Sequence, residues 1–206
     1  MLFTFEGIEG SGKTTQVEIL YEYLASQGRS VIKTREPGGK LFGEALRKVL
    51  LQEDMHVFPL SELLVFMAMR SQHVEEVIMP ALQDGKIVLC DRFVDATYAY
   101  QGYGRNIDLG IIETLNRLVT KGIRPNLTIL LDVSAEVGLR RKAAHAAMDR
   151  FEKEALSFHK EIRDAYIKLS KEDPKRFFVV DGSLEPQIIQ NTIRQKVEKL
   201  LKGYGI

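Results

Sequence analysis

Short apolar runs alternate with stretches of helical periodicity along the whole chain. Residues 2–5 are apolar and end at Glu6-Gly7, which predicts a buried strand. The next stretch places Val17, Leu20 and Leu24 on one face of an amphipathic helix. The predicted strands are 2–5, 30–34, 87–90, 127–132 and 177–180. The predicted helices are 14–26, 41–51, 60–84, 108–120, 136–142, 150–171 and 185–201.

Apolar strands that alternate with helices are typical of parallel βαβ units, with helices on both faces of one sheet. We therefore expect a three-layer α/β fold around a five-stranded parallel sheet. The 206 residues are enough for one domain with a single core. Ligands of such sheets bind beyond the carboxyl ends of the strands. The residues that follow each strand are therefore the candidates for chemistry.

Composition narrows the functional classes. The chain has 29 Lys and Arg against 28 Asp and Glu, whereas a protein that coats nucleic acid needs a basic excess. Its one cysteine, Cys90, cannot form an intrachain disulfide, and no Cys/His cluster has zinc spacing. The N-terminus lacks the basic and apolar regions of a signal peptide, and no apolar run approaches a membrane span. We expect a cytoplasmic protein that binds neither nucleic acid nor membrane.

The most specific motif follows the first predicted strand. Residues 7–14, GIEGSGKT, match the pattern G-x-x-x-x-G-K-[ST] at every fixed position. The glycines let backbone N–H groups turn toward a phosphate, Lys13 can reach the β- and γ-phosphates, and Thr14 can bind Mg²⁺. The loop and the following helix therefore predict binding of ATP with Mg²⁺. The predicted ATP-binding residues are Gly7, Ile8, Glu9, Gly10, Ser11, Gly12, Lys13, Thr14 and Thr15.

A second phosphate site would distinguish a kinase from a simple nucleotide-binding protein. Arg35 follows the second predicted strand and Arg92 the third, and arginine can bind a phosphate with two parallel hydrogen bonds. Asp91 can hold a magnesium-bound water, and Asp132 after the fourth strand is its rival. We favour Asp91 because it adjoins Arg92 and precedes polar, aromatic sequence. A solvated turn at Arg35 and a local ion pair at 91–92 are the alternatives.

Phe66 and Arg70 lie four positions apart on the predicted helix 60–84, so they share a face. The ring could stack on a nucleobase, and the guanidinium could donate hydrogen bonds to it. Spacing alone favours the simpler alternative of a core phenylalanine and an arginine that reaches solvent.

Five ordered segments together resemble the bacterial thymidylate kinases over nearly the whole chain. They are GIEGSGKTT, TREPGG at 34–39, FMAMR at 66–70, DRFVDATYAYQGYGR at 91–105 and MDRFE at 148–152. The segment 91–105 is the most specific, because its Asp-Arg start and Tyr-Ala-Tyr-Gln-Gly core recur together in that family. The resemblance implies a P-loop nucleotide kinase fold and a homodimer. It also implies in-line, Mg²⁺-dependent phosphorylation of dTMP to dTDP by ATP.

The resemblance also gives the substrate-binding residues. Arg35 and Arg92 would hold the acceptor phosphate, with Arg47 assisting. Glu9 would contact the 3′-hydroxyl side of the sugar, and Tyr100 would crowd a ribose 2′-hydroxyl.

Four further residues would recognise the base. Phe66 would stack on thymine and Arg70 would bind its carbonyl edge. Thr97 and Gln101 would complete the recognition of the base.

The resemblance places a mobile lid at about 141–150. Family members whose phosphate loop lacks an arginine, as here, usually carry arginines in the lid, yet this segment is rich in alanine. The cation that stabilises the transition state could be Arg140, Arg141, Lys142 or Arg150, and we choose Arg141 and Arg150. The predicted catalytic residues are Lys13, Asp91, Arg92, Arg141 and Arg150, with Thr14 and Asp91 at the metal.

Two other functions stay open. The chain could phosphorylate another nucleoside monophosphate, with the same pocket serving a different base. It could also be a switch that binds ATP and transfers nothing, although a switch would not need the second set of arginines.

Overall fold

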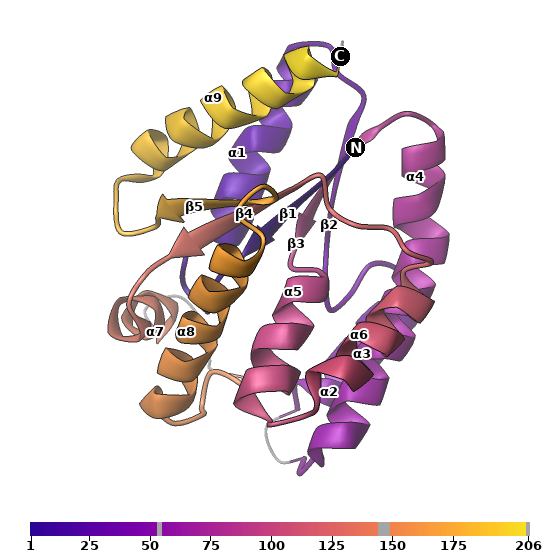
Figure 1. Ribbon diagram of the computed structural model, residues 1–206, viewed down its shortest axis with the longest axis vertical. Helices are drawn as coiled ribbons and strands as arrows, with labels where there is room; N and C mark the ends of the chain where they lie inside the picture. Colours follow the sequence, from indigo (N-terminus) through magenta and orange to yellow (C-terminus); the bar gives the residue numbers. More distant parts are fainter. Residues whose placement is uncertain (53–54, 144–148, 205–206) are drawn as a thin grey trace.

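The protein is built around a five-stranded parallel sheet with the strand order β2-β3-β1-β4-β5 (Figure 1). The computed structural model describes residues 1–52, 55–143 and 149–204. The strands are β1 (Leu2–Glu6), β2 (Val31–Arg35), β3 (Ile87–Asp91), β4 (Leu127–Asp132) and β5 (Phe177–Asp181). All five lie where the sequence predicts them. The predicted α/β fold is therefore confirmed.

Helices cover both faces of the sheet (Figure 1). The longer ones are α1 (Lys13–Ser26), α2 (Leu41–Leu50), α3 (Pro59–His73), α6 (Leu109–Val119), α7 (Ala135–Ala143), α8 (Leu156–Glu172) and α9 (Pro186–Gly203). Two short helices, α4 (Met79–Gln83) and α5 (Val94–Thr97), adjoin the π-helical segments η1 (Val74–Ile78) and η2 (Tyr98–Gly104). No helix in the described ranges is long and apolar enough to cross a membrane.

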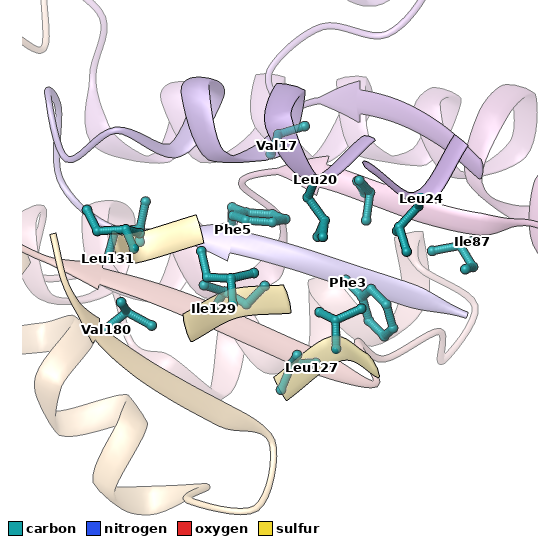
Figure 2. Close-up of a cluster of buried hydrophobic side chains, with 14 of the residues drawn as sticks. Phe3, Phe5, Val17, Leu20, Leu24, Ile87, Leu127, Ile129, Leu131 and Val180 are labelled. Carbon is teal, nitrogen blue, oxygen red and sulfur yellow. The ribbon is translucent and has the colours of Figure 1, made fainter. Parts of the chain in front are cut away.

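Successive side chains of β1 point to opposite faces of the sheet, so this strand contributes to the core on both faces. Phe3 and Phe5 point toward α1, where Leu20 lies above them (Figure 2), and α9 completes this cluster. Because successive strand residues point to opposite faces, Thr4 and Glu6 face the other side, and both are fully buried. A carboxylate therefore lies under the end of β1, next to the phosphate loop.

The helix predicted over 150–171 begins only at Leu156, so its first turn is a wrong prediction. Asp149 forms a tight turn instead: its Oδ1 accepts hydrogen bonds from the backbone N–H groups of Phe151 and Glu152. The Glu152 carboxylate accepts from the N–H of Asp149 in return. Side-chain bonds of this kind satisfy the backbone locally and compete with helix formation.

Two further differences concern helices. The predicted helix 60–84 is present as α3, η1 and α4, with a π-helical turn in the middle. The sequence pattern gave no helix between 91 and 107, yet α5 and η2 occupy most of it. Such π-helical turns occur often at functional sites, and η2 carries two of the predicted substrate residues. Half of the predicted lid, residues 144–148, lies outside the described residues.

Candidate active site

A cavity of about 780 Å³ lies beyond the carboxyl ends of the strands. Its wall includes 9–16 after β1, 35–37 at the end of β2, 91–92 at the end of β3 and 182–186 after β5. This is where a parallel sheet binds its ligands, and the volume suits a small molecule. The predicted residues that line it are Glu9, Gly10, Ser11, Gly12, Lys13, Thr14, Thr15, Arg35, Arg47, Phe66, Arg70, Asp91, Arg92, Thr97, Tyr100, Gln101 and Arg141.

The phosphate loop joins β1 to α1, as its motif predicts. Gly10 and Gly12 have φ angles of 68° and 97°, a region in which residues with side chains are strained. A Cβ on Gly10 would also lie 2.0 Å from the carbonyl oxygen of Gly138. No side chain caps the start of α1. The N–H groups of its first turn therefore have no side-chain acceptor and can bind a ligand in the cavity. An anion is well suited to this place.

The side chain of Lys13 lies folded over its own loop. Its Nζ donates hydrogen bonds to the carbonyl oxygens of Gly7 and Ile8, at 3.0 and 2.8 Å, and to Ser11 Oγ at 3.3 Å. Burial, together with the nearby Arg92, lowers the pKa of Lys13 to about 8. Gly7 and Ile8 are not among the described residues that line the cavity, and they contribute their carbonyl groups to this lysine.

The two predicted metal residues are in direct contact. Thr14 Oγ1 donates a hydrogen bond of 2.6 Å to Asp91 Oδ2, and both side chains line the cavity. A hydroxyl and a carboxylate are the oxygen donors that Mg²⁺ prefers, so the pair fits a magnesium–phosphate complex. Its rival Asp132 instead binds Arg163 through both carboxylate oxygens, at 2.7 and 2.9 Å.

Three arginines line the cavity next to the phosphate loop, and Arg92 donates to the carbonyl oxygen of Gly7 in that loop at 3.0 Å. Arg35 lies at the end of β2 and is paired with Glu44, while Arg47 on α2 donates to the carbonyl oxygen of Pro37. Arg92 follows β3 with a φ angle of 67°, a strained conformation for a side chain of this size. Burial and the charge of Arg35 lower the pKa of Arg47. Cations that repel one another in this way form a site for an anion.

Arg70 lies at the floor of the cavity and does not reach solvent, so the simpler explanation of this arginine is wrong. Its Nε donates to Glu36, and its Nη1 donates to Thr97 and Asn116. Its Nη2 donates to the carbonyl oxygen of Phe93, so four of the five guanidinium N–H groups have protein partners. These hydrogen bonds fix the plane of the guanidinium group in the wall of the cavity, where a ligand could contact it.

Glu9 is clamped between two side chains of the acceptor side. Its Oε1 accepts hydrogen bonds from Tyr100 Oη at 2.6 Å and from Arg92 Nη2 at 3.0 Å. Burial alone would raise the pKa of Glu9, but Arg92 holds it well below its usual range. Glu9 is therefore a carboxylate whose direction is set by its neighbours.

Beneath Glu9 and Arg92 lies a second carboxylate, Glu6. It accepts hydrogen bonds from the N–H of Phe93 and from Tyr166 Oη, at 2.7 and 2.8 Å. Arg92 Nη1 donates to the same Tyr166 oxygen at 3.2 Å. Burial, assisted by Asp95, raises the pKa of Glu6 to about 8.

We expect Glu6→Gln to flatten the pH dependence of stability. The folded protein keeps the Glu6 proton at pH values where the unfolded carboxyl has lost it, so the free energy of unfolding must fall as the pH rises from 4.5 toward 8. Between about pH 5.5 and pH 8 the parent should lose on the order of 3 kcal/mol more than the variant. Urea unfolding at both pH values measures this, and parallel losses would contradict it.

Arg141 and Arg150, the two predicted lid cations, lie in different surroundings. Arg141, at the end of α7, donates to the carbonyl oxygens of Gly182 and Ser183 and lines the cavity. Arg150 is not among the described residues that line it. Its guanidinium donates to the carbonyl oxygen of Leu50 and lies 2.9 Å from the buried carboxylate of Glu62. The geometry therefore supports Arg141 at the phosphates and gives Arg150 a structural partner instead.

Besides Glu6, the sequence reasoning missed five buried residues around this site. Glu36 lies within the quoted segment 34–39, so that segment contained its signal. The others are polar side chains on helices, which the apolar pattern passes over. They are Glu62, Asn116, His159 and Tyr166, and all four are buried.

Taken together, a phosphate loop, an adjacent hydroxyl–carboxylate pair that could hold Mg²⁺ and a set of arginines on the same cavity define the class of P-loop nucleotide kinases. The family model for thymidylate kinase matches residues 5–193. The chain belongs to the thymidylate kinase family, as the resemblance in the sequence predicts.

Individual relatives agree with this assignment. The chain is 51% identical over 187 residues to a thymidylate kinase from Geotalea uraniireducens (strain Rf4), covering 87% of this chain and 88% of the relative. It is 48% identical over 211 residues to one from Geobacter sp. (strain M21), covering 97% and 94%. The crystal structure of thymidylate kinase from Ehrlichia chaffeensis superposes with a TM-score of 0.81, at 36% identity and covering 96% of this chain and 98% of that one.

Proposed function

We propose that the protein transfers the γ-phosphoryl group of ATP to the phosphate of dTMP, which yields dTDP for dTTP synthesis. The observation that carries the proposal is the arrangement of two phosphate-binding groups on one cavity. One group consists of Lys13 and the start of α1, and the other consists of Arg35, Arg47 and Arg92, which come from β2, α2 and the end of β3. An enzyme that moves a phosphoryl group between two nucleotides needs both. We also propose that it acts in the cytoplasm, because both substrates are soluble nucleotides.

On the donor side the chain binds and orients the triphosphate. The loop N–H groups would hold the β-phosphate, and Lys13 would leave its loop carbonyls to lie between the β- and γ-phosphates. Mg²⁺, when bound, would neutralise the phosphate oxygens next to Thr14 and Asp91. Arg141 is the cation best placed to reach the migrating group.

On the acceptor side the chain fixes the nucleotide in line with that phosphate. Arg92, with Arg35 and Arg47, would hold the acceptor phosphate. Phe66 would stack on the base and Arg70 would donate its remaining N–H to a base carbonyl.

Thr97 and Gln101 would complete the base site from α5 and η2. Thr97 accepts from Arg70, and Gln101 is held by the carboxylate of Glu62 at 2.9 Å. Tyr100 would lie against the sugar and would crowd a 2′-hydroxyl there. Positioning and charge are sufficient for this chemistry, because the loose transition state needs no covalent intermediate.

The decisive experiment is a coupled assay with ATP and a panel of dTMP, dUMP, dCMP and AMP. We expect dTMP to have the highest kcat/KM. The advantage over dUMP rests on one methyl group, which is worth about 1 kcal/mol or about fivefold. A preference for another base would point to the alternative kinase. Binding of ATP without transfer to any monophosphate would point to a switch.

Arg92→Ala tests the acceptor site. Removal of this guanidinium should raise the KM for dTMP about 100-fold, since it takes away a charge-assisted pair to the phosphate and frees Glu9. The KM for ATP should change less than about threefold. Arg163→Ala is the matched control, because that arginine binds Asp132 rather than the cavity. Equal losses of both affinities in Arg92→Ala would rule out the assigned role.

We also propose that the protein is a homodimer through the face formed by α3 and α6. These two helices pack together and expose apolar side chains that a second copy could bury: Leu60, Leu64, Leu109, Ile111 and Leu118. Sedimentation of the parent and of Leu64→Glu should give a dimer and a monomer respectively. A parent that sediments as a monomer at micromolar concentration would contradict the proposal.

A further inference from the structure

His159 is a buried polar side chain that the mechanism above does not use. It lies on α8 and is fully buried, and neither ring nitrogen has a hydrogen-bond partner among the described residues. A buried imidazole in this state costs free energy that an apolar side chain would not. Such a residue needs a reason to be where it is.

The nearest polar group is the other oxygen of Glu9. His159 Nδ1 lies 3.4 Å from Glu9 Oε2, slightly beyond a good hydrogen bond, and this oxygen also lacks a partner among the described residues. Glu9 Oε1, in contrast, is bound by both Arg92 and Tyr100. A shift of a few tenths of an ångström would join the two unpartnered groups.

The same face of α8 also carries Tyr166, which contacts Arg92, the ion-pair partner of Glu9. His159 and Tyr166 are seven positions apart, so they project from one side of the helix. Tyr166 Oη accepts from Arg92 Nη1 and donates to Glu6. One helix therefore places a polar side chain against each member of the ion pair.

We propose that His159 is a positioning residue that donates its Nδ1–H to Glu9 Oε2 when the acceptor nucleotide is bound. A carboxylate has about four acceptor positions, of which Tyr100 and Arg92 fill two on Oε1 and His159 fills a third. The Oε2 atom is itself buried, so a bond from His159 would fix the plane of the carboxylate, and with it the direction that Glu9 presents to the 3′-hydroxyl side of the acceptor sugar. This inference rests on the proposed function, since it takes Glu9 as the residue that meets the sugar.

The test compares side chains that do and do not carry a donor at the Nδ1 position. His159→Asn places an amide N–H there, whereas His159→Gln places it further out, near Nε2, and His159→Phe has no donor. Each variant is assayed with dTMP and with its 3′-deoxy analogue, with thermal unfolding as the check on folding. If either His159→Gln or His159→Phe fails to fold, the other decides.

With dTMP, His159→Gln and His159→Phe should lose about tenfold in kcat/KM, and His159→Asn should stay within about threefold of the parent. With the 3′-deoxy analogue all three variants should match the parent, because the hydroxyl that Glu9 meets is missing. The KM for ATP should not change in any of them.

Two results would overturn the proposal. One is an equal loss with both nucleotides, which indicates a purely structural histidine, and the other is an asparagine variant as impaired as the glutamine variant. Failure of the proposed function itself is seen separately, as a parent that does not phosphorylate dTMP. The comparison then uses the deoxynucleotide that the parent does phosphorylate, with and without its 3′-hydroxyl.

Discussion

Lys13→Ala should lower kcat for dTMP phosphorylation by at least about 1,000-fold while the protein stays folded. The Nζ group is the one cation of the phosphate loop itself, and it lies within 3.0 Å of two loop carbonyls from which the phosphates would take it. Its charge acts on the migrating phosphoryl group in the transition state, where no other loop atom can replace it. The loss should therefore fall on kcat more than on the KM for dTMP.

The stability of the same variant separates chemistry from folding. Lys13→Ala removes hydrogen bonds to the buried carbonyl oxygens of Gly7 and Ile8, but it also removes a buried charge, so the two effects offset each other and the free energy of unfolding should change by less than about 2 kcal/mol. Lys33→Ala is the control, because Lys33 forms an exposed ion pair with Glu18 and should have full activity. Steady-state assays measure kcat, and single turnovers measure the phosphoryl-transfer step itself. A Lys13→Ala variant within tenfold of the parent in both would remove Lys13 from the mechanism.

The sequence was most informative where function depends on residues adjacent in the chain. The phosphate loop is a local structure: its glycines, Lys13 and Thr14 are fixed relative to one another by eight consecutive residues, so the motif predicts the geometry. Asp91 and Arg92 were found by a second local rule, the end of a buried strand. Both rules depend on backbone direction, and side-chain packing does not enter them.

The supporting residues could not be found in this way. Arg70 was ambiguous from its spacing because its partners Glu36, Thr97 and Asn116 lie 27 to 46 positions away. Which of them meet is decided by how α3, α5 and α6 pack. Apolar periodicity gives the face that each helix buries, but it does not say which polar groups are buried with it.

The partner of Arg150 could not be predicted from the sequence either. Its position beside the predicted lid suggested a catalytic cation, and sequence alone could not reveal the carboxylate 88 positions earlier that holds it. In the structure the Arg150 guanidinium donates to the carbonyl oxygen of Leu50, and this residue is not among the described residues that line the cavity. A charge near a functional segment is assigned safely only when its partner is known.

Glu62→Ala should destabilise the protein by about 3–5 kcal/mol, the cost of breaking a buried ionic cluster from one side. The Glu62 carboxylate is fully buried between Arg150 at 2.9 Å and Arg105 at 3.4 Å, and it also accepts from Gln101. Its removal leaves the guanidinium of Arg150 in the interior without this counter-ion. Arg105 keeps a second partner, Glu154, so the penalty falls mainly on Arg150.

The variants Glu62→Gln and Glu75→Ala bracket this effect in urea unfolding. Glu62→Gln keeps the size and one acceptor but loses the charge, so it should cost about half as much. Glu75→Ala removes an exposed ion pair with Lys121 from the same helical stretch and should cost less than about 1 kcal/mol. If Glu62→Ala costs no more than Glu75→Ala, the cluster does not hold α3 to the segment after the lid. A fall in dTMP affinity in folded Glu62→Gln would further show that Gln101 depends on this carboxylate for its position in the base site.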